Sequence, residues 1–382
     1  KIWYCFGMAE QVLYRKYRPQ TFADVAGQEQ VTSFLQSAIR LNRIAHAYLF
    51  SGPRGTGKTT VARLLAKAAS CEKPKDGEPC NTCSICKEFS AGTGLDLIEI
   101  DAASSRGIDE IRELREAIRL APARAKYKTY VVDECHMLTK EAFNALLKTL
   151  EEPPAHAIFI LATTNIEKVP ETIVSRTQHY EFRKIPMPVI VERLQKVVKK
   201  EGISADKDAL QLLALFADGG LRDAESMLGQ VLSGRGKLTA GDVRLVLGAP
   251  PEEAVLSFVA ALLEKDAAKA ARVANDAVDQ GIDPQFYLKM ILRNVRYLLL
   301  GRLDARTVAQ FANSMTDAEQ QFLKEHGAKA SMPELERMMK SLIDAYWMSY
   351  RTVFPQLPLE LAVVDILRDT FGEQKKEEVK EV

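Results

Sequence analysis

The sequence predicts an α/β domain built on a parallel sheet, followed by domains that are entirely helical. In the first half of the chain, apolar runs typical of buried strands alternate with helical periodicity. From residue 184 onward, apolar residues recur only at helical spacing. The chain has 382 residues, which is enough for about two or three domains with cores of their own. The strands are expected at about residues 47–50, 95–101, 129–134 and 157–164.

Charge and cysteine content narrow the class of protein. Lys and Arg number 52 against 51 Asp and Glu, so no global basic field marks a stand-alone nucleic-acid binder. Six cysteines in a chain of this length do not indicate a disulfide-stapled secreted protein. The apolar residues 1–7 lack a cleavage pattern, so we interpret residues 1–10 as an extension and not as a signal peptide. We expect a cytoplasmic protein with no membrane contact, since no apolar run approaches the ~20 residues of a membrane span.

The most specific motif is a phosphate-binding loop of the pattern GxxxxGK[ST], which lies between an apolar strand and an amphipathic helix. Its glycines let successive backbone N–H groups point into one concavity, and the helix adds its positive N-terminal end. We expect Lys58 to reach the β- and γ-phosphates of ATP and Thr59 to bind Mg²⁺ through its hydroxyl. The residues predicted to bind ATP here are Gly52, Pro53, Arg54, Gly55, Thr56, Gly57, Lys58, Thr59 and Thr60.

A later apolar strand supplies the second half of a nucleotide site. It ends in Asp133 and Glu134, at the sheet edge where ligands bind in open α/β folds. Asp133 is expected to hold Mg²⁺ through a coordinated water, and Glu134 to orient or deprotonate the attacking water. Thr164 follows the next strand, where it either senses the γ-phosphate or simply ends the strand.

The string Asp133-Glu134-Cys135-His136 also occurs in superfamily 2 helicases. Such a helicase would carry an arginine-rich stretch in a second motor domain, and this sequence has none. We therefore interpret His136 as the approach to a helix at residues 138–151, without a catalytic role. That helix is expected to stop at the proline pair 153–154.

A cluster of cysteines interrupts the α/β pattern within residues 71–86. Thiolates so close together form a ligand set, and tetrahedral Zn²⁺ takes four sulfurs and then has no position left for water. We predict a structural zinc site, with an iron–sulfur cluster as the alternative because clusters also take sulfur ligands. A zinc-dependent nucleic-acid module is less favoured, since Phe89 is the only aromatic residue nearby. The predicted ligands are Cys71, Cys80, Cys83 and Cys86.

These motifs together resemble the gamma/tau family of bacterial DNA polymerase III clamp-loader ATPases, which are AAA+ proteins. The resemblance extends over about residues 11–250. Residues 11–31 resemble the box that folds over the adenine base, which implies that Tyr17, Arg18 and Val25 contact the base. The strings that carry the resemblance are the phosphate loop, the cysteine insert, residues 133–138, 144–154 and 161–164, Ser175-Arg176 and residues 221–224.

The same resemblance implies two further catalytic arginines. Arg176 corresponds to the arginine finger that reaches the ATP of a neighbouring subunit, although Thr177 replaces the cysteine of the family's serine-arginine-cysteine motif. Arg222 corresponds to the second sensor, which contacts the γ-phosphate in cis. Lys148 is either a contact at the same interface or a solvated helix residue. Arg106, in a loop before a helix expected at residues 108–120, either faces a DNA backbone or is solvated.

The resemblance also implies a domain order and a function. It predicts an ATP-hydrolysing motor that opens a sliding clamp and loads it onto primed DNA for the DNA polymerase III holoenzyme. The alternative is a non-hydrolysing scaffold subunit of the same ring, against which Lys58, Thr59 and Glu134 argue. The implied partners are delta and delta-prime subunits, further copies of this chain, the sliding clamp and primer–template DNA. The implied domains are an ATPase domain (11–183), a lid (184–249), a collar (250–372) and a charged tail (373–382).

Overall fold

The computed structural model describes residues 12–104, 116–232, 236–304, 306–307, 311 and 315–368. The chain divides into two compact units. The first comprises Lys1–Ser204 and Leu213–Gly236, and the second comprises Ala205–Leu212 and Lys237–Val382. Arg106 lies outside the described residues, as do the predicted extension at 1–10 and the predicted tail at 373–382.

Within the described part of the first unit, five parallel strands form one sheet in the order β2-β3-β4-β1-β5. The strand that leads into the phosphate loop, β1, therefore lies between β4 and β5. The carboxyl ends of β1, β3 and β4 all open toward the same edge of the sheet, because the strands are parallel. The strands are β1 (Ala47–Ser51), β2 (Leu97–Asp101), β3 (Lys128–Asp133), β4 (Ala157–Thr163) and β5 (Gln178–Glu181).

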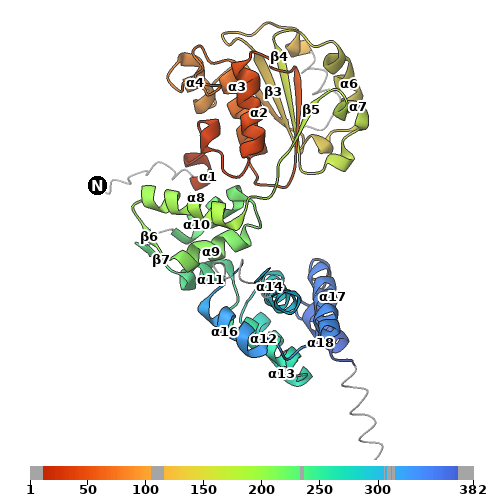
Figure 1. Ribbon diagram of the computed structural model, residues 1–382. Coiled ribbons are helices and arrows are strands. Elements are labelled where there is room, and N and C mark those ends of the chain that lie inside the picture. The colour runs from red at the N-terminus through yellow and green to blue at the C-terminus, as the bar shows by residue number, and fades with distance from the viewer. Residues whose placement is uncertain are drawn as a thin grey trace, which may run out of the picture. The chain divides into compact units, whose positions relative to one another are not determined.

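Helices cover both faces of this sheet (Figure 1). On one face α2 and α3 pack through Leu35 and Leu65 against Tyr48 and Phe50 of β1. On the other face α6 and α7 pack against the opposite side chains of the same strands, such as Leu49. The three central strands β1, β3 and β4 are thus buried on both sides, which agrees with their near-continuous apolar sequences, whereas the edge strands β2 and β5 are partly exposed. The helices are α2 (Glu29–Arg40), α3 (Lys58–Ala69), α6 (Lys140–Glu151) and α7 (Glu171–Val174).

Shorter elements surround this core. The helix expected at residues 138–151 begins at Lys140, and His136 lies before it in a separate 3₁₀ turn, η2, that follows the left-handed backbone of Glu134 (φ 47°). The cysteine insert contains a helix, α4, that the sequence analysis did not predict. These elements are α1 (Leu13–Lys16), η1 (Phe22–Asp24), α4 (Ser84–Ala91), η2 (Cys135–Met137) and η3 (Ile166–Lys168).

The predicted lid stretch is helical but not purely so. Two short strands, β6 (Ser204–Ala205) and β7 (Lys237–Leu238), form a separate two-stranded sheet. The expectation of helix alone was therefore wrong at these points, since two-residue strands are too short to leave a period in the sequence. The helices of this stretch are α8 (Met187–Lys200), α9 (Lys207–Phe216), α10 (Leu221–Leu232) and α11 (Ala240–Leu247).

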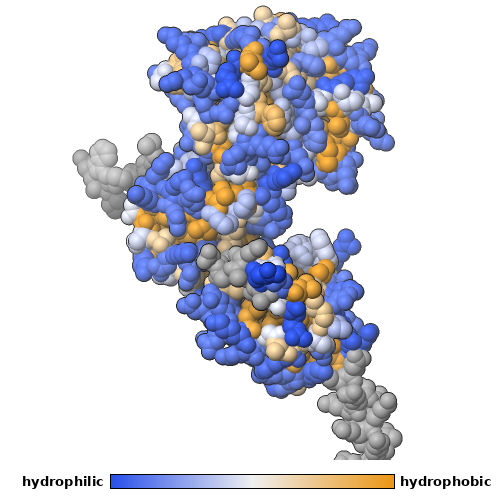
Figure 2. All heavy atoms as spheres, viewed as in Figure 1, coloured by the Kyte–Doolittle hydropathy of each residue, from blue (hydrophilic) through white to orange (hydrophobic). Residues whose placement is uncertain are grey.

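The described remainder of the second unit is helical, as predicted. Its helices are α12 (Glu252–Leu263), α13 (Ala267–Asp279), α14 (Pro284–Leu303), α16 (Asp317–His326), α17 (Met332–Met348) and α18 (Leu357–Ile366). Large apolar side chains such as Trp347 and Phe354 remain exposed, each at 66%. Figure 2 shows hydrophobic patches among the hydrophilic surface of one face. Among the described residues no single helix is long and apolar enough to cross a membrane, although the bent pair α11–α12 passes by length and composition.

Candidate functional site

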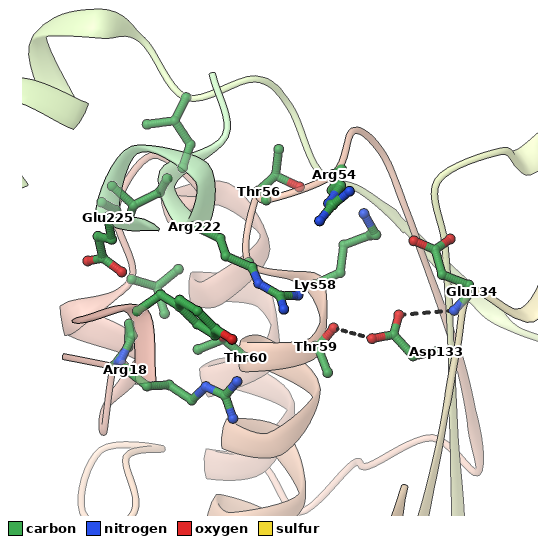
Figure 3. A pocket seen from close by; sticks show the side chains of 18 of the residues that line it. Arg18, Arg54, Thr56, Lys58, Thr59, Thr60, Asp133, Glu134, Arg222 and Glu225 are labelled. Carbon is green, nitrogen blue, oxygen red and sulfur yellow. Dashed lines mark hydrogen bonds between the residues drawn. The ribbon is translucent and has the colours of Figure 1, made fainter. Parts of the chain in front are cut away.

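A cavity of about 470 Å³ opens in the first unit beside the carboxyl ends of the strands. Its lining comes from the N-terminal segment before α2, the phosphate loop with the start of α3, the ends of β2 and β3, Ile185 before α8, and the start of α10 (Figure 3). The lining residues are Tyr14, Arg18, Pro19, Val25, Ala26, Arg54, Gly55, Thr56, Gly57, Lys58, Thr59, Thr60, Asp101, Ala103, Asp133, Glu134, Ile185, Leu221, Arg222 and Glu225.

The phosphate loop adopts a backbone that only its glycines allow. Gly57 precedes α3 with φ at 103°, so its neighbour Lys58 begins the helix. Gly52 has φ at 135°, and a Cβ atom there would lie 2.1 Å from the carbonyl oxygen of Phe182. Both positions are therefore closed to other residues. The loop and the N-terminus of α3 form one concavity with free N–H groups of the kind that binds phosphate.

The side chain of Lys58 is folded back onto its own loop. Its ammonium donates to the carbonyl oxygens of Gly52 at 2.7 Å and Pro53 at 2.8 Å. Burial lowers the pKa of Lys58, while the carboxylates of Glu134 and Asp133 act in the opposite direction. An anionic phosphate entering the loop would compete with two neutral carbonyls for this ammonium. Gly52 and Pro53 thus serve Lys58 without lining the cavity themselves.

Thr59 and Asp133 meet as the sequence analysis expects of a magnesium pair. The hydroxyl of Thr59 donates to Asp133 Oδ2 at 2.7 Å, and Asp133 Oδ1 accepts from the backbone N–H of Glu134 at 3.0 Å. A hydroxyl and a carboxylate are oxygen ligands of the type that Mg²⁺ takes beside substrate phosphates. Figure 3 shows both side chains on the cavity wall opposite Arg222.

Glu134 is held by residues at the end of the neighbouring strand. Its Oε2 accepts from the backbone N–H of Thr164 at 3.1 Å and from the Thr164 hydroxyl at 2.8 Å. His136 Nδ1 lies 3.3 Å from the same oxygen and 3.0 Å from the Thr163 hydroxyl. Thr164 therefore reaches the site through Glu134, since it does not line the cavity. His136, to which the sequence analysis gave no catalytic role, contacts the residue expected to position water.

The rest of the cavity wall is made by side chains from distant parts of the chain. The guanidinium of Arg222, from α10, lies 4.7 Å from the centre of the Tyr14 ring, and its hydrogen bond lowers the pKa of the Tyr14 hydroxyl. Arg18 lines the cavity, and its pKa is lowered by burial and by the nearby charge of Arg63. Val25 lines it too, but Tyr17 does not: the ammonium groups of its neighbours lie over its ring instead.

Of the cavity residues that sequence reasoning missed, three have polar side chains: Tyr14, Asp101 and Glu225. Glu225 is 4% exposed, its pKa is raised by burial, and it pairs with Arg193 at 3.1 Å. Arg193 also donates to the backbone oxygen of Tyr17. This pair therefore links α10 and α8 to the N-terminal segment. The spacing of Glu225 three residues after Arg222 on one helix was the only signal available for it.

The predicted arginine finger lies outside this cavity. Arg176 follows α7 and is ion-paired with Glu151 of α6 at 2.8 Å, with about a third of its side chain exposed (36%). It also donates to the carbonyl oxygen of Thr172 at 2.8 Å. Lys148 is exposed on the same helix, α6, as Glu151. The two residues lie at the surface of the first unit, and neither lines the cavity.

The four cysteines of the insert converge as a ligand set. Their sulfur atoms all lie within 4.8 Å of one another. Backbone N–H groups donate to three of them, for example Cys80 N to Cys71 Sγ at 3.3 Å. Hydrogen bonds from Thr82 lower the pKa of Cys80 to about 5, whereas burial raises the pKa of Cys86. An all-sulfur set with amide donors fits Zn²⁺, which would take the cysteines as thiolates.

A parallel sheet with this phosphate loop, the acidic strand end at Asp133 and a following helical lid define an AAA+ P-loop protein. Family models divide the chain among three descriptions. Residues 27–186 match "DNA polymerase III, delta subunit", residues 189–236 match the "DNA polymerase III clamp loader subunit, ATPase lid domain", and residues 238–382 match "DNA polymerase III subunits gamma and tau domain III".

Curated relatives carry matching names. DNA polymerase III subunit tau of Bacillus subtilis is 42% identical over 94% of this chain and 63% of its own length. Subunit gamma of Buchnera aphidicola from Acyrthosiphon pisum is 40% identical over 75% of this chain and 80% of its own length. Escherichia coli subunit tau is 46% identical, with 72% of this chain and 43% of that protein covered. A solved structure of Thermotoga maritima RuvB aligns over 65% of the chain and 80% of its own length with a TM-score of 0.46 and 16% identity.

The chain belongs to the gamma/tau clamp-loader subunits of bacterial DNA polymerase III. This confirms the family and the fold class predicted from the sequence. The chain spans about 63% of the Bacillus subtilis relative and 43% of the Escherichia coli relative.

Proposed function

We propose that this chain is an ATP-hydrolysing motor subunit that opens a sliding clamp and loads it onto primed DNA. The observation that carries the proposal is the convergence of Lys58, Thr59, Asp133, Glu134 and Arg222 on one cavity. A scaffold subunit without turnover would need neither the lysine nor the glutamate there. We propose a lid at residues 184–249 and a collar at residues 250–372. Family models of the same clamp loader support this order, with the lid model matching residues 189–236 and the domain III model matching residues 238–382.

The reaction is attack of water on the γ-phosphorus of ATP, with ADP as the leaving group. Glu134 orients that water and accepts its proton, once its carboxylate is released from Thr164. Lys58 and Arg222 place positive charge beside the γ-phosphate, where negative charge is redistributed in the transition state. Thr59 and Asp133 would hold Mg²⁺, which would supply positive charge to balance that of the phosphates.

Assembly would complete the site. Arg176 is partly exposed and its ion pair with Glu151 lies at the surface, where such pairs contribute little stability, so a neighbouring subunit's ATP can replace Glu151 as its partner. We propose that the neighbours are further copies of this chain and delta and delta-prime subunits, and that the ring acts on a sliding clamp and primer–template DNA in the cytoplasm. Hydrolysis then depends on assembly, because a finger supplied in trans is worth about 10³ to 10⁵ in turnover.

The test is steady-state ATP hydrolysis by this chain alone, then with the partner subunits, clamp and primer–template DNA. A steep rise only with the complete set supports the proposal. Rates that ignore clamp and DNA would contradict the loading function while leaving ATP binding intact.

Arg176→Ala and Lys58→Ala subunits, mixed within one assembly, test the shared site. Each variant alone should be inactive at the affected interface, since one lacks a finger and the other lacks a working phosphate loop. A mixture forms some interfaces in which a Lys58→Ala subunit supplies its finger to an Arg176→Ala subunit, so turnover should partly return. Mixed assemblies that are demonstrated by native mass spectrometry yet show no recovery would exclude a finger in trans.

We also propose that the four cysteines hold one structural Zn²⁺. Their convergence within 4.8 Å supports this, and their sulfur-only chemistry leaves no position for a catalytic water. Elemental analysis should find about one zinc per chain. Iron in place of zinc, with the visible absorption of a cluster, would favour the iron–sulfur alternative.

A further inference from the structure

A tight turn at residues 75–78 of the cysteine insert contacts a neighbouring part of the first unit. Lys75 N donates to Glu78 O at 3.0 Å, and Glu78 N donates to Lys75 O at 2.8 Å. The central residues, Asp76 (φ 53°) and Gly77 (φ 83°), are both left-handed, as in a type I′ turn. A Cβ atom on Gly77 would lie 2.4 Å from the carbonyl oxygen of Gln36, so the turn rests directly on α2. Glu78 is thereby placed against the main body of the first unit.

The Glu78 carboxylate binds the segment that leads from the N-terminus into α2. Its Oε2 accepts from Phe22 N at 2.7 Å, and its Oε1 accepts from Ala23 N at 2.9 Å and from Gln36 Nε2 at 2.7 Å. The two N–H groups open the short helix η1, where the first backbone donors have no partner within the helix. Hydrogen bonds to an ionised acceptor are about twice as strong as neutral ones.

A second contact joins the insert to the same segment. Ser90, in α4, donates through its hydroxyl to Gln20 Oε1 at 3.0 Å. The ammonium of Lys67 donates to both groups, at 2.9 Å to Gln20 Oε1 and at 3.2 Å to Ser90 Oγ. Lys67 is 3% exposed and lies on α3, the helix that begins at the phosphate loop. Hydrogen bonds among these three side chains thus connect the insert, the N-terminal segment and the phosphate-loop helix.

The segment held in this way is a wall of the nucleotide cavity. Arg18 and Pro19 precede the braced residues, Val25 and Ala26 follow them, and all four line the cavity. Phe22, between them, is 1% exposed in the core formed with α2 and α3. A shift of the braced amides would therefore move the cavity wall on both sides of them.

We propose that Glu78 is a positioning residue that couples metal occupancy of the four-cysteine site to nucleotide affinity. The cysteines on either side of the turn, Cys71 and Cys80, close the loop that carries Glu78, so a bound metal restricts the conformations of that loop. With the metal in place, Glu78 is preorganised to hold the cavity wall. The inference rests on the proposed nucleotide and zinc sites, and it predicts reciprocal effects because coupling between two binding sites is symmetric.

The test compares the wild type with Glu78→Gln, which keeps one acceptor oxygen but loses the charge. Glu72→Gln is the matched control: it lies in the same insert, but its hydrogen bond, accepted from the Ser84 hydroxyl at 3.0 Å, stays within the insert. Nucleotide affinity is measured by titrating a fluorescent, non-hydrolysable ATP analogue, and zinc affinity by competition with a chromogenic chelator. Thermal melting of each variant shows whether it is folded.

We expect Glu78→Gln to weaken analogue binding by about tenfold, while Glu72→Gln leaves it unchanged. Stripping zinc from the wild type should weaken analogue binding by a similar factor, and stripping it from Glu78→Gln should add little. The analogue should in turn tighten zinc binding in the wild type and not in Glu78→Gln. Unchanged affinity in a folded Glu78→Gln, or equal effects of zinc removal in both proteins, would overturn the coupling and leave the proposed function intact. Failure of the wild type to bind the analogue at all would overturn both.

Discussion

The two sides of the nucleotide cavity are built in different ways. The phosphate side comes from the contiguous loop at residues 52–59 and from two strand ends, and backbone geometry at Gly52 and Gly57 shapes it. The other side comes from residues far apart in the chain, such as Tyr14 before α2 and Glu225 of α10, which are held by side-chain contacts. We therefore expect the phosphate side, which is a local backbone motif, to position the charged groups that act in hydrolysis. We expect the other side, which depends on contacts between distant segments, to set nucleotide affinity and to change when those segments move. Substitutions on the first side should therefore affect turnover, and those on the second should affect binding.

Lys58→Ala should have the largest effect. It removes the ammonium that is expected to bind the β- and γ-phosphates and to balance charge in the transition state, so hydrolysis should be abolished. The measurement is single-turnover hydrolysis in the complete assembly. Lys196→Ala is a useful control, because Lys196 is an exposed lysine of α8 that pairs with Glu192 and does not line the cavity. Near-normal hydrolysis by Lys58→Ala would contradict the assignment of residues 52–59 as the loop that binds the phosphates of ATP.

Glu134→Gln should reduce hydrolysis by about 10²- to 10⁴-fold, because the amide cannot accept the proton of the attacking water. Analogue affinity should stay within about twofold of the wild type, since the neutral isostere can still accept from Thr164 and removes one negative charge from the site. If turnover and analogue affinity fell together, Glu134 would contribute to nucleotide binding as well as to hydrolysis. That result would contradict the proposed difference between the two sides of the cavity.

Tyr14→Leu should have the smallest effect and should appear in affinity. The stacked cation–π contact with Arg222 is worth about 0.5–2 kcal/mol, so analogue binding should weaken by less than about thirtyfold with turnover at saturation retained. Tyr14→Phe keeps the ring and loses the hydroxyl, and it should lie near the wild type. If Phe is as harmful as Leu, the hydrogen bond that lowers the Tyr14 pKa, and not the stacking, holds Arg222.

The four-cysteine insert and the phosphate loop are the parts of the molecule whose structure could be predicted best from contiguous residues. Both motifs have short spacings, so the elements that hold them are local, and the four sulfurs and the loop lie where the pattern predicts. The strand ends at Asp133 and Thr164 were predictable because parallel strands end at one edge. The role of Thr164 was not predictable, since its hydroxyl donates to Glu134 at the end of the neighbouring strand.

The sequence by itself determined the fold class, the phosphate loop, the acidic pair and the four candidate metal ligands. Each of these follows from hydrophobic periodicity or from residues that lie close together in the sequence. Only the tertiary structure decided which aromatic residue meets Arg222. Tyr14 and Tyr17 lie three positions apart, and packing against α10 brings Tyr14 to the cavity and leaves Tyr17 outside its lining. The brace from Glu78 to Phe22 and Ala23 likewise exists only in the fold, since about fifty residues separate its partners and no local pattern records a contact made across that distance.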